Sequence, residues 1–228
     1  MFTFESRASA GRHLAAALRH HAGAGAIVLG MPRGGIPVAS QVAGPLMADI
    51  DVLIVHETAV GLYVEGCRPL IELPRTIKLG IPAADITREI AHETAQIQRE
   101  IALFRGQRPF PHIVGRTAIL VDDGTATPRM LGAALSSLRA RGASTVLAVP
   151  VLDPAAERAL ASYADELVVL AIADGRGIEQ AYRELEPLAD SDVIVELNRA
   201  RIAAWNTRPT LPTLPTIPAE RPSSPAIG

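Results

Sequence analysis

The residues around two adjacent carboxylates, Asp122 and Asp123, say more about possible chemistry than any other part of this sequence. The two carboxylates follow a β-branched and aliphatic run at residues 117–121, which predicts a buried strand. Small and hydroxyl residues occupy 124–127, and the apolar spacing then predicts a helix over residues 128–141. A strand, an acidic pair, a hydroxyl-rich loop and a helix N-terminus therefore follow one another without interruption.

This succession suits a sugar phosphate. The two carboxylates can accept hydrogen bonds from two ribose hydroxyls. The backbone N–H groups of the loop, its two threonine hydroxyls and the positive end of the helix can hold a phosphate. Thr127 and Pro128 also make a favourable helix start, with threonine as the N-cap and proline at the first helical position. The candidate phosphate-binding residues are Gly124, Thr125, Ala126, Thr127 and Arg129.

A second turn with glycines follows the strand predicted at residues 26–30 and precedes a helix predicted at 36–47. Arg33, Gly34 and Gly35 form this turn, where glycine lets backbone amides approach an anion and arginine adds a cation. Taken alone, the turn is best read as an ordinary tight strand-to-helix connection. Its combination with the acidic loop favours a second anion-binding position.

The stretch at residues 117–130 resembles the phosphoribosyl-diphosphate (PRPP) motif of type I phosphoribosyltransferases. That motif consists of an apolar strand, Asp-Asp, Gly-x-Ala-Thr-Gly, a small residue and Thr. The resemblance is strong at residues 121–127 and 32–35 and weak elsewhere between residues 4 and 201. The positions that match the motif after the strand are Asp122, Asp123, Gly124, Ala126 and Thr127.

The resemblance implies an enzyme that binds PRPP or a nucleoside 5′-phosphate. It would transfer the phosphoribosyl group to a base or small aromatic acceptor and release diphosphate. Asp122 and Asp123 would be its catalytic residues and would hold the ribose hydroxyls, directly or through Mg²⁺, the implied cofactor. The turn at residues 33–35 would bind the diphosphate. Tyr182 is the one candidate for a ring against the base, and a packing role for this tyrosine is the simpler alternative.

Several residues depart from the family pattern. Pro128 stands in place of glycine and removes an N–H from the phosphate loop. Arg129 and Met130 replace a small residue and threonine, and His56-Glu57 replaces a basic pair. Two readings therefore stay open: a working phosphoribosyltransferase with an unusual acceptor, or a protein of this fold with weakened or no catalysis that serves as a ligand-binding, regulatory or assembly component.

Strands alternate with helices along most of the chain, which predicts an α/β fold with a doubly wound, mainly parallel sheet and, from the resemblance, a small hood. Ligands of such sheets lie beyond the carboxyl ends of the strands, where both candidate loops are expected. The other predicted strands cover residues 51–55, 144–151 and 166–170. One further helix is predicted to end near residue 21, and others cover 82–104, 154–164 and 191–201. The segment 71–80 is predicted to be extended.

Composition limits the remaining possibilities. The chain has 228 residues, a formal charge of −2 and one cysteine, Cys67. Near-neutral charge gives no indication of nucleic-acid binding, and a single cysteine excludes an internal disulfide. No run is long and apolar enough to cross a membrane, so a cytoplasmic protein is expected. His92 lacks a second histidine one turn later, where Gln96 stands, so no helical zinc pair is predicted.

The chain is expected to divide into a phosphoribosyltransferase-like domain at residues 1–204 and a tail at 205–228. The tail repeats Thr-Leu-Pro with a period of three, which favours an extended or disordered segment. It could be inert, or it could dock into an aromatic groove of a partner protein. The oligomeric state is not readable from the sequence, and the resemblance allows a homodimer.

Overall fold

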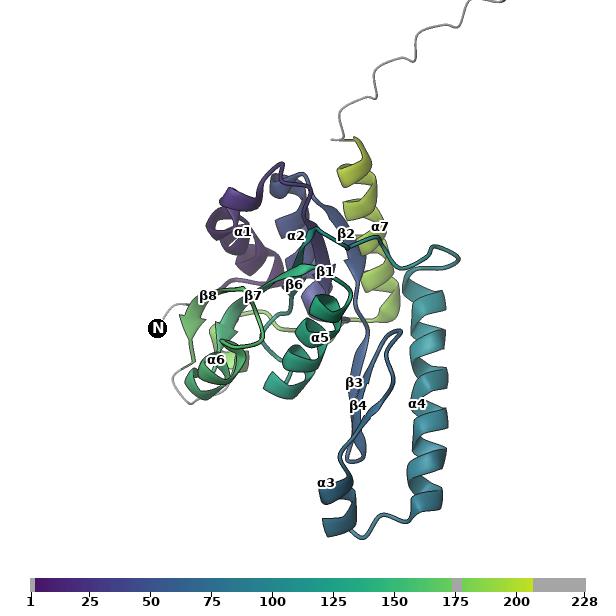
Figure 1. Cartoon of the computed structure of the whole chain (residues 1–228). Coiled ribbons are helices and arrows are strands. Elements are labelled where there is room, and N and C mark those ends of the chain that lie inside the picture. The colour runs from purple at the N-terminus through teal and green to yellow at the C-terminus, as the bar shows by residue number, and fades with distance from the viewer. Residues whose placement is uncertain (1–2, 174–177, 207–228) are drawn as a thin grey trace, which may run out of the picture.

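The computed structural model describes residues 3–173 and 178–206. A five-stranded parallel sheet with strand order β2-β1-β6-β7-β8 forms the centre, and a three-stranded antiparallel sheet, β3-β4-β5, lies apart from it (Figure 1). The α/β fold class with a parallel sheet and a hood is therefore confirmed. The parallel strands are β2 (Asp49–Val52), β1 (Ile27–Gly30), β6 (Thr117–Val121), β7 (Ser144–Leu152) and β8 (Glu166–Ile172).

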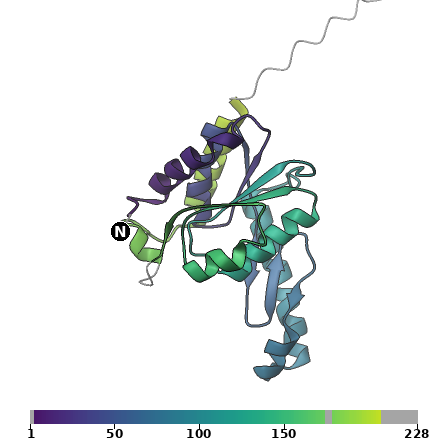
Figure 2. The ribbon, with the colours of Figure 1, turned by 60° about the vertical axis from the view of Figure 1, so that its left-hand side comes forward.

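Helices cover both faces of the parallel sheet (Figure 2). One face packs against α1 (Arg7–Ala17), α2 (Gly35–Leu46) and α7 (Asp190–Asn206), and the other against α5 (Pro128–Ala140) and α6 (Pro154–Leu160). Alternate residues of β6 point to opposite faces of the sheet. Ile119 packs in the core under α1, α2 and α7, and Leu120 packs in the core under α5 and α6. Burial on both faces explains why the strands read as continuous apolar runs.

The hood projects from the sheet (Figure 1) and consists of one continuous segment of the chain. It contains β3 (Val55–Glu57), β4 (Gly61–Val64), β5 (Leu70–Ile71), α3 (Leu73–Lys78) and the long helix α4 (Ala83–Phe104). The expectation of an extended segment at 71–80 was wrong, because α3 occupies most of it. Pro74 lies in the first turn of α3, where the missing N–H has no helical partner to lose.

Other boundaries also differ from the sequence expectations. The strand predicted at 51–55 is β2, which ends at Val52, and a new strand starts at Val55. The first helix, expected to end near residue 21, ends at Ala17, and its start at Arg7 is capped by the Ser6 side chain, which accepts a hydrogen bond from Ser9 N. Helix α7 runs to Asn206, past the expected domain boundary at 204, and the Pro-rich repeat lies outside the described residues. Within the described residues, no helix is long and apolar enough to cross a membrane.

A buried ion cluster joins the base of the hood to the sheet. Arg105, just after α4, donates from Nε to Asp51 Oδ1 over 3.2 Å and also bonds the Glu65 carboxylate. Arg201 of α7 donates to the same Asp51 oxygen over 2.7 Å. These charges are compensated by one another, so removing one member would leave a buried charge without its partner.

His56 attaches the hood strands to α4. Its Nδ1 lies 2.7 Å from Glu93 Oε2 and its Nε2 lies 3.1 Å from Glu100 Oε2. The Glu93 side chain is only 13% exposed, because it faces β3. Hydrogen bonds to Glu100 and Glu93 outweigh burial and raise the pKa of His56.

The His56 contacts predict a pH-dependent contribution to stability. Because the folded-state pKa of His56 is raised, the contribution is fully present below the unfolded-state value of about 6.5 and is lost as pH rises through the folded-state value. Urea unfolding of wild type and His56→Gln between pH 5.5 and 9 should show a difference in unfolding free energy that shrinks with rising pH. A difference that is constant over this range would contradict the assignment.

Candidate functional site

The two candidate loops meet at the carboxyl ends of neighbouring strands. Met31 N donates to the Val121 carbonyl oxygen over 2.9 Å, which joins the turn after β1 to the end of β6. A Cβ at Gly34 would lie 2.0 Å from Asp123 Oδ2, and one at Gly35 would lie 2.5 Å from Val121 O. Only glycine permits this approach, so the two adjacent glycines are required by the contact between loops.

Asp122 turns its carboxylate back into its own loop. The side chain is buried, and Oδ2 accepts hydrogen bonds from Gly124 N at 2.8 Å and Ala126 N at 3.0 Å. Burial, followed by the charge of Asp123, raises the pKa of Asp122 to about 7, although the amide bonds act in the opposite direction. Near neutral pH this group is therefore able to exist as acid or carboxylate.

Asp123 is fully buried and has partners from separate parts of the chain. Its Oδ1 accepts from Thr125 N at 3.1 Å and Thr125 Oγ1 at 2.7 Å, and its Oδ2 accepts from Arg7 Nε at 2.9 Å. Its carbonyl oxygen accepts from the Tyr182 hydroxyl at 2.6 Å. Because Asp123 is fully buried, a ribose hydroxyl would reach its carboxylate only after covering residues such as Thr125 or Arg7 move aside.

These contacts test whether the acidic pair fits a directly bound Mg²⁺. Magnesium takes oxygen ligands in near-octahedral geometry. Both Asp123 oxygens already accept hydrogen bonds, one of them from the cationic Arg7, and Asp122 Oδ2 accepts from two amides. Direct coordination by this pair does not fit the arrangement. The same bonds use the N–H groups of residues 124–126, which reduces the donors left for a phosphate.

Thr127 forms the start of α5 as predicted. Its Oγ1 accepts a hydrogen bond from Met130 N at 3.2 Å, and Pro128 is the first helical residue. The same hydroxyl donates to the carboxylate of Glu57, the last residue of β3. An acid of the hood therefore contacts the position that the sequence assigns to a phosphate.

The two candidate arginines have acidic partners. Arg129 lies 3.0 Å from Glu57 Oε1 through NH1 and bonds the Glu72 carboxylate through NH2, so its guanidinium is directed toward the hood. Arg33 bonds Asp190 at the start of α7, and this hydrogen bond raises the pKa of Arg33. Its side chain is 49% exposed, so it can exchange Asp190 for a ligand anion with little repacking.

Tyr182 contacts the acidic pair through its hydroxyl. The residue is 6% exposed, and its ring packs against Phe4 with 5.6 Å between ring centroids. Burial raises the pKa of its phenol, which remains a hydrogen-bond donor to Asp123 O. In this arrangement Tyr182 positions the loop through its backbone and offers no open face to a base.

Sequence reasoning missed Arg7 and Glu57 as neighbours of the site. Arg7 lies 116 positions from Asp123, and no local pattern connects them. Glu57 was noticeable as an acid where the resembled family has a basic residue, but its contact with Thr127 depends on how the hood folds back.

Comparison with known proteins supplies the family. A Mycobacterium tuberculosis H37Rv protein named "putative phosphoribosyl transferase" is 37% identical in an alignment 212 residues long that covers 88% of this chain. The chain belongs to the type I phosphoribosyltransferase family. This family member spans 47% of the length of that relative, and the same values hold for the counterpart in strain CDC 1551.

One solved structure has a similar fold over nearly its whole length. TT1426 from Thermus thermophilus is 31% identical with a TM-score of 0.74, and the match covers 87% of this phosphoribosyltransferase-family chain and 99% of TT1426. No family model matches the chain.

A cavity of about 600 Å³ lies between the hood and α5 of this family member. Leu62 and Leu70 line it from the hood, and Pro128, Arg129 and Tyr163 line it from the other side. Its walls do not include either aspartate of the acidic pair. The cavity therefore borders the start of α5, and it does not expose the carboxylates of Asp122 and Asp123.

The contact between loops predicts the effect of one methyl group. Gly35→Ala places Cβ against the Val121 carbonyl oxygen, and we expect a loss of about 1–3 kcal/mol in unfolding free energy. Gly44→Ala, in the same helix, is the matched control, because no atom lies within 4 Å of its Cβ. The control should gain up to about 1 kcal/mol through helix propensity. Equal melting temperatures for the two variants would contradict the loop contact.

Proposed function

We propose that this protein binds PRPP or a nucleoside 5′-phosphate where the loop at 31–35 meets the loop at 122–129. In the proposed reaction it transfers the phosphoribosyl group to a base or small aromatic acceptor. The observation that carries the proposal is the junction itself: two strand-to-helix loops meet at the carboxyl ends of adjacent strands, with an acidic pair between them. Membership of the family supports the same class of reaction.

The proposed chemistry requires positioning and charge compensation. The bond from ribose C1 to the diphosphate oxygen breaks, the acceptor nitrogen bonds C1, and the acceptor proton passes to solvent or a base. Positive charge on the sugar would be stabilised by Asp122 and Asp123, and negative charge on the leaving diphosphate by Arg33. Gly34 and Gly35 would bring backbone close to that diphosphate.

The 5′-phosphate would lie at the start of α5, near the hydroxyls of Thr125 and Thr127 and the helix N-terminus. Magnesium is proposed as the counter-ion that accompanies PRPP, since direct coordination by the acidic pair does not fit. Asp123 would exchange one of its present donors for a ribose hydroxyl when the substrate binds.

A second function is favoured by the hood contacts. Glu57 bonds Thr127 and Arg129, so a negative group already occupies the neighbourhood of the expected phosphate. A protein of this family that binds a ligand for regulation or assembly, with slow or no transfer, fits that arrangement. Release of diphosphate separates the two functions.

The proposed function predicts that PRPP, supplied with Mg²⁺, binds at the acidic pair. Calorimetry should give a saturable heat for wild type that Asp122→Asn and Asp123→Asn reduce at least tenfold in affinity. Asp153→Asn is the matched control, because Asp153 caps α6 and asparagine caps equally well. Diphosphate release with a panel of bases and aromatic acids should then identify the acceptor. Unchanged binding in both variants would remove the site assignment, and binding without release would favour the second function.

Glu57 predicts a gain of affinity. Glu57→Gln removes a negative charge next to Thr127, so ribose 5-phosphate should bind about tenfold more tightly, equivalent to ~1.4 kcal/mol. Glu72→Gln is the control, since Glu72 also pairs with Arg129 but belongs to a different part of the hood, just before α3. Equal or weaker binding by Glu57→Gln would show that the acid does not compete with phosphate.

A further inference from the structure

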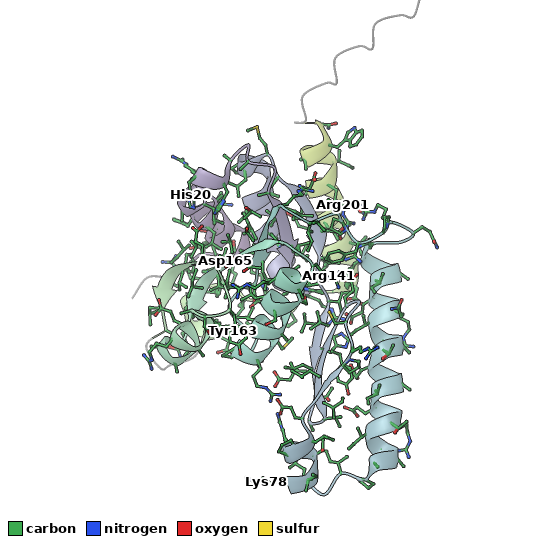
Figure 3. All side chains as sticks on the ribbon, viewed as in Figure 1. His20, Lys78, Arg141, Tyr163, Asp165 and Arg201 are labelled. Atoms are coloured by element: carbon green, nitrogen blue, oxygen red, sulfur yellow. The ribbon has the colours of Figure 1, made fainter. Side chains whose placement is uncertain are left out.

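A cluster of two imidazoles and one carboxylate lies away from the candidate site. His20 Nε2 is 2.9 Å from Glu166 Oε1, and His21 Nε2 is 2.9 Å from Glu166 Oε2. One ligand atom from each residue can be chosen so that all three lie within 4.8 Å of one another. Figure 3 shows His20 beside α1, far from the hood tip that Lys78 marks.

Local structure explains why the three side chains converge. The two histidines end a short 3₁₀ helix, η1 (Arg19–His21), that follows α1, and their rings lie in contact at a tilt of 42°, with 4.2 Å between centroids. Glu166 is the first residue of the edge strand β8, at the end of the sheet opposite the candidate loops. Each histidine contacts one carboxylate oxygen, so the carboxylate bridges the two Nε2 atoms.

The donor set has the chemistry of a transition-metal site. Two imidazole nitrogens and a carboxylate are a recognised zinc ligand combination, with a further position left for water. Zinc lies about 2.0–2.1 Å from a ligating nitrogen, so the three ligand atoms, which now lie within 4.8 Å of one another, would draw closer around the ion. Imidazole also selects against magnesium, which prefers oxygen ligands.

We infer that His20, His21 and Glu166 form a binding site for a divalent transition-metal ion of the zinc class. The inference is independent of the proposed function. The ion would link the segment after α1 to the edge strand, two parts of the chain 145 and 146 positions apart. Because α1 begins at Arg7, the donor to Asp123, the ion would stabilise the helix that supplies this contact.

The burial of the cluster suits a stabilising role. The His21 side chain is 14% exposed and Glu166 is 34% exposed, whereas His20 is 56% exposed. The inner histidine and the carboxylate are held by the fold, and the outer histidine can turn toward an incoming ion. Asp165, next in sequence, is already bonded to Thr145 and Arg139, so it is not counted as a ligand.

Titration of ZnCl₂ into the tag-free full chain tests the site. We expect one zinc ion per chain with a Kd in the micromolar range or tighter, weakened at least tenfold in both His21→Ala and Glu166→Gln. His92→Ala is the matched control, because His92 is also exposed and lies 3.0 Å from a carboxylate oxygen of Glu93. Zinc at a hundredfold excess over Kd should raise the melting temperature of wild type by roughly 5 °C and that of His21→Ala by much less.

Cobalt absorption keeps the test decisive if a variant is unstable. Co²⁺ bound to wild type should give the visible bands of a four- or five-coordinate ion, and ZnCl₂ should displace them. Loss of these bands in His20→Ala, with the chelator-treated variant still folded, would support the site. No saturable zinc binding by wild type, or loss of binding in His92→Ala but not in His21→Ala, would overturn it.

Discussion

The burial of Asp123 is the constraint on which the rest of the site depends. A fully buried carboxylate is stable only when hydrogen bonds and an opposite charge replace its hydration. Arg7 supplies the charge from α1, Thr125 supplies two donors from the same loop, and Tyr182 fixes the backbone through the carbonyl oxygen. Gly34 lies against the same carboxylate. Asp123 therefore joins segments that are far apart in the sequence, around Arg7, Gly34 and Tyr182, at the carboxyl ends of the strands.

The hood places acidic groups beside the start of α5. His56 of β3 bonds acids of α4, whereas Glu57 of β3 bonds Thr127 and Arg129 at the start of α5. Arg129 also bonds Glu72. Under the proposed function, an anionic ligand at this position would compete with these carboxylates, so the hood residues would affect its affinity together with the loop motif.

Local features of the sequence predicted most of the sheet and its helices, because burial on two faces leaves continuous apolar runs. They also predicted the cap at Thr127, which depends only on residues 127–130. The helix at Leu73–Lys78 was missed: it is only six residues long, too short to show a helical apolar period, and Pro74 is tolerated in its first turn. Arg7 could not be assigned from the sequence, since its role exists only after distant segments have come together.

The length of α4 has a mechanical consequence. Twenty-two residues of helix extend about 33 Å, and the buried ions that fix this arm lie at one end of it. A rigid tilt of one degree at Arg105 would displace the far end of the arm by about 0.6 Å, given that length. The exposed side chains of Leu73, Ile77 and Leu79 would move with it, and the bond from Arg129 of α5 to Glu72, just before α3, opposes that movement.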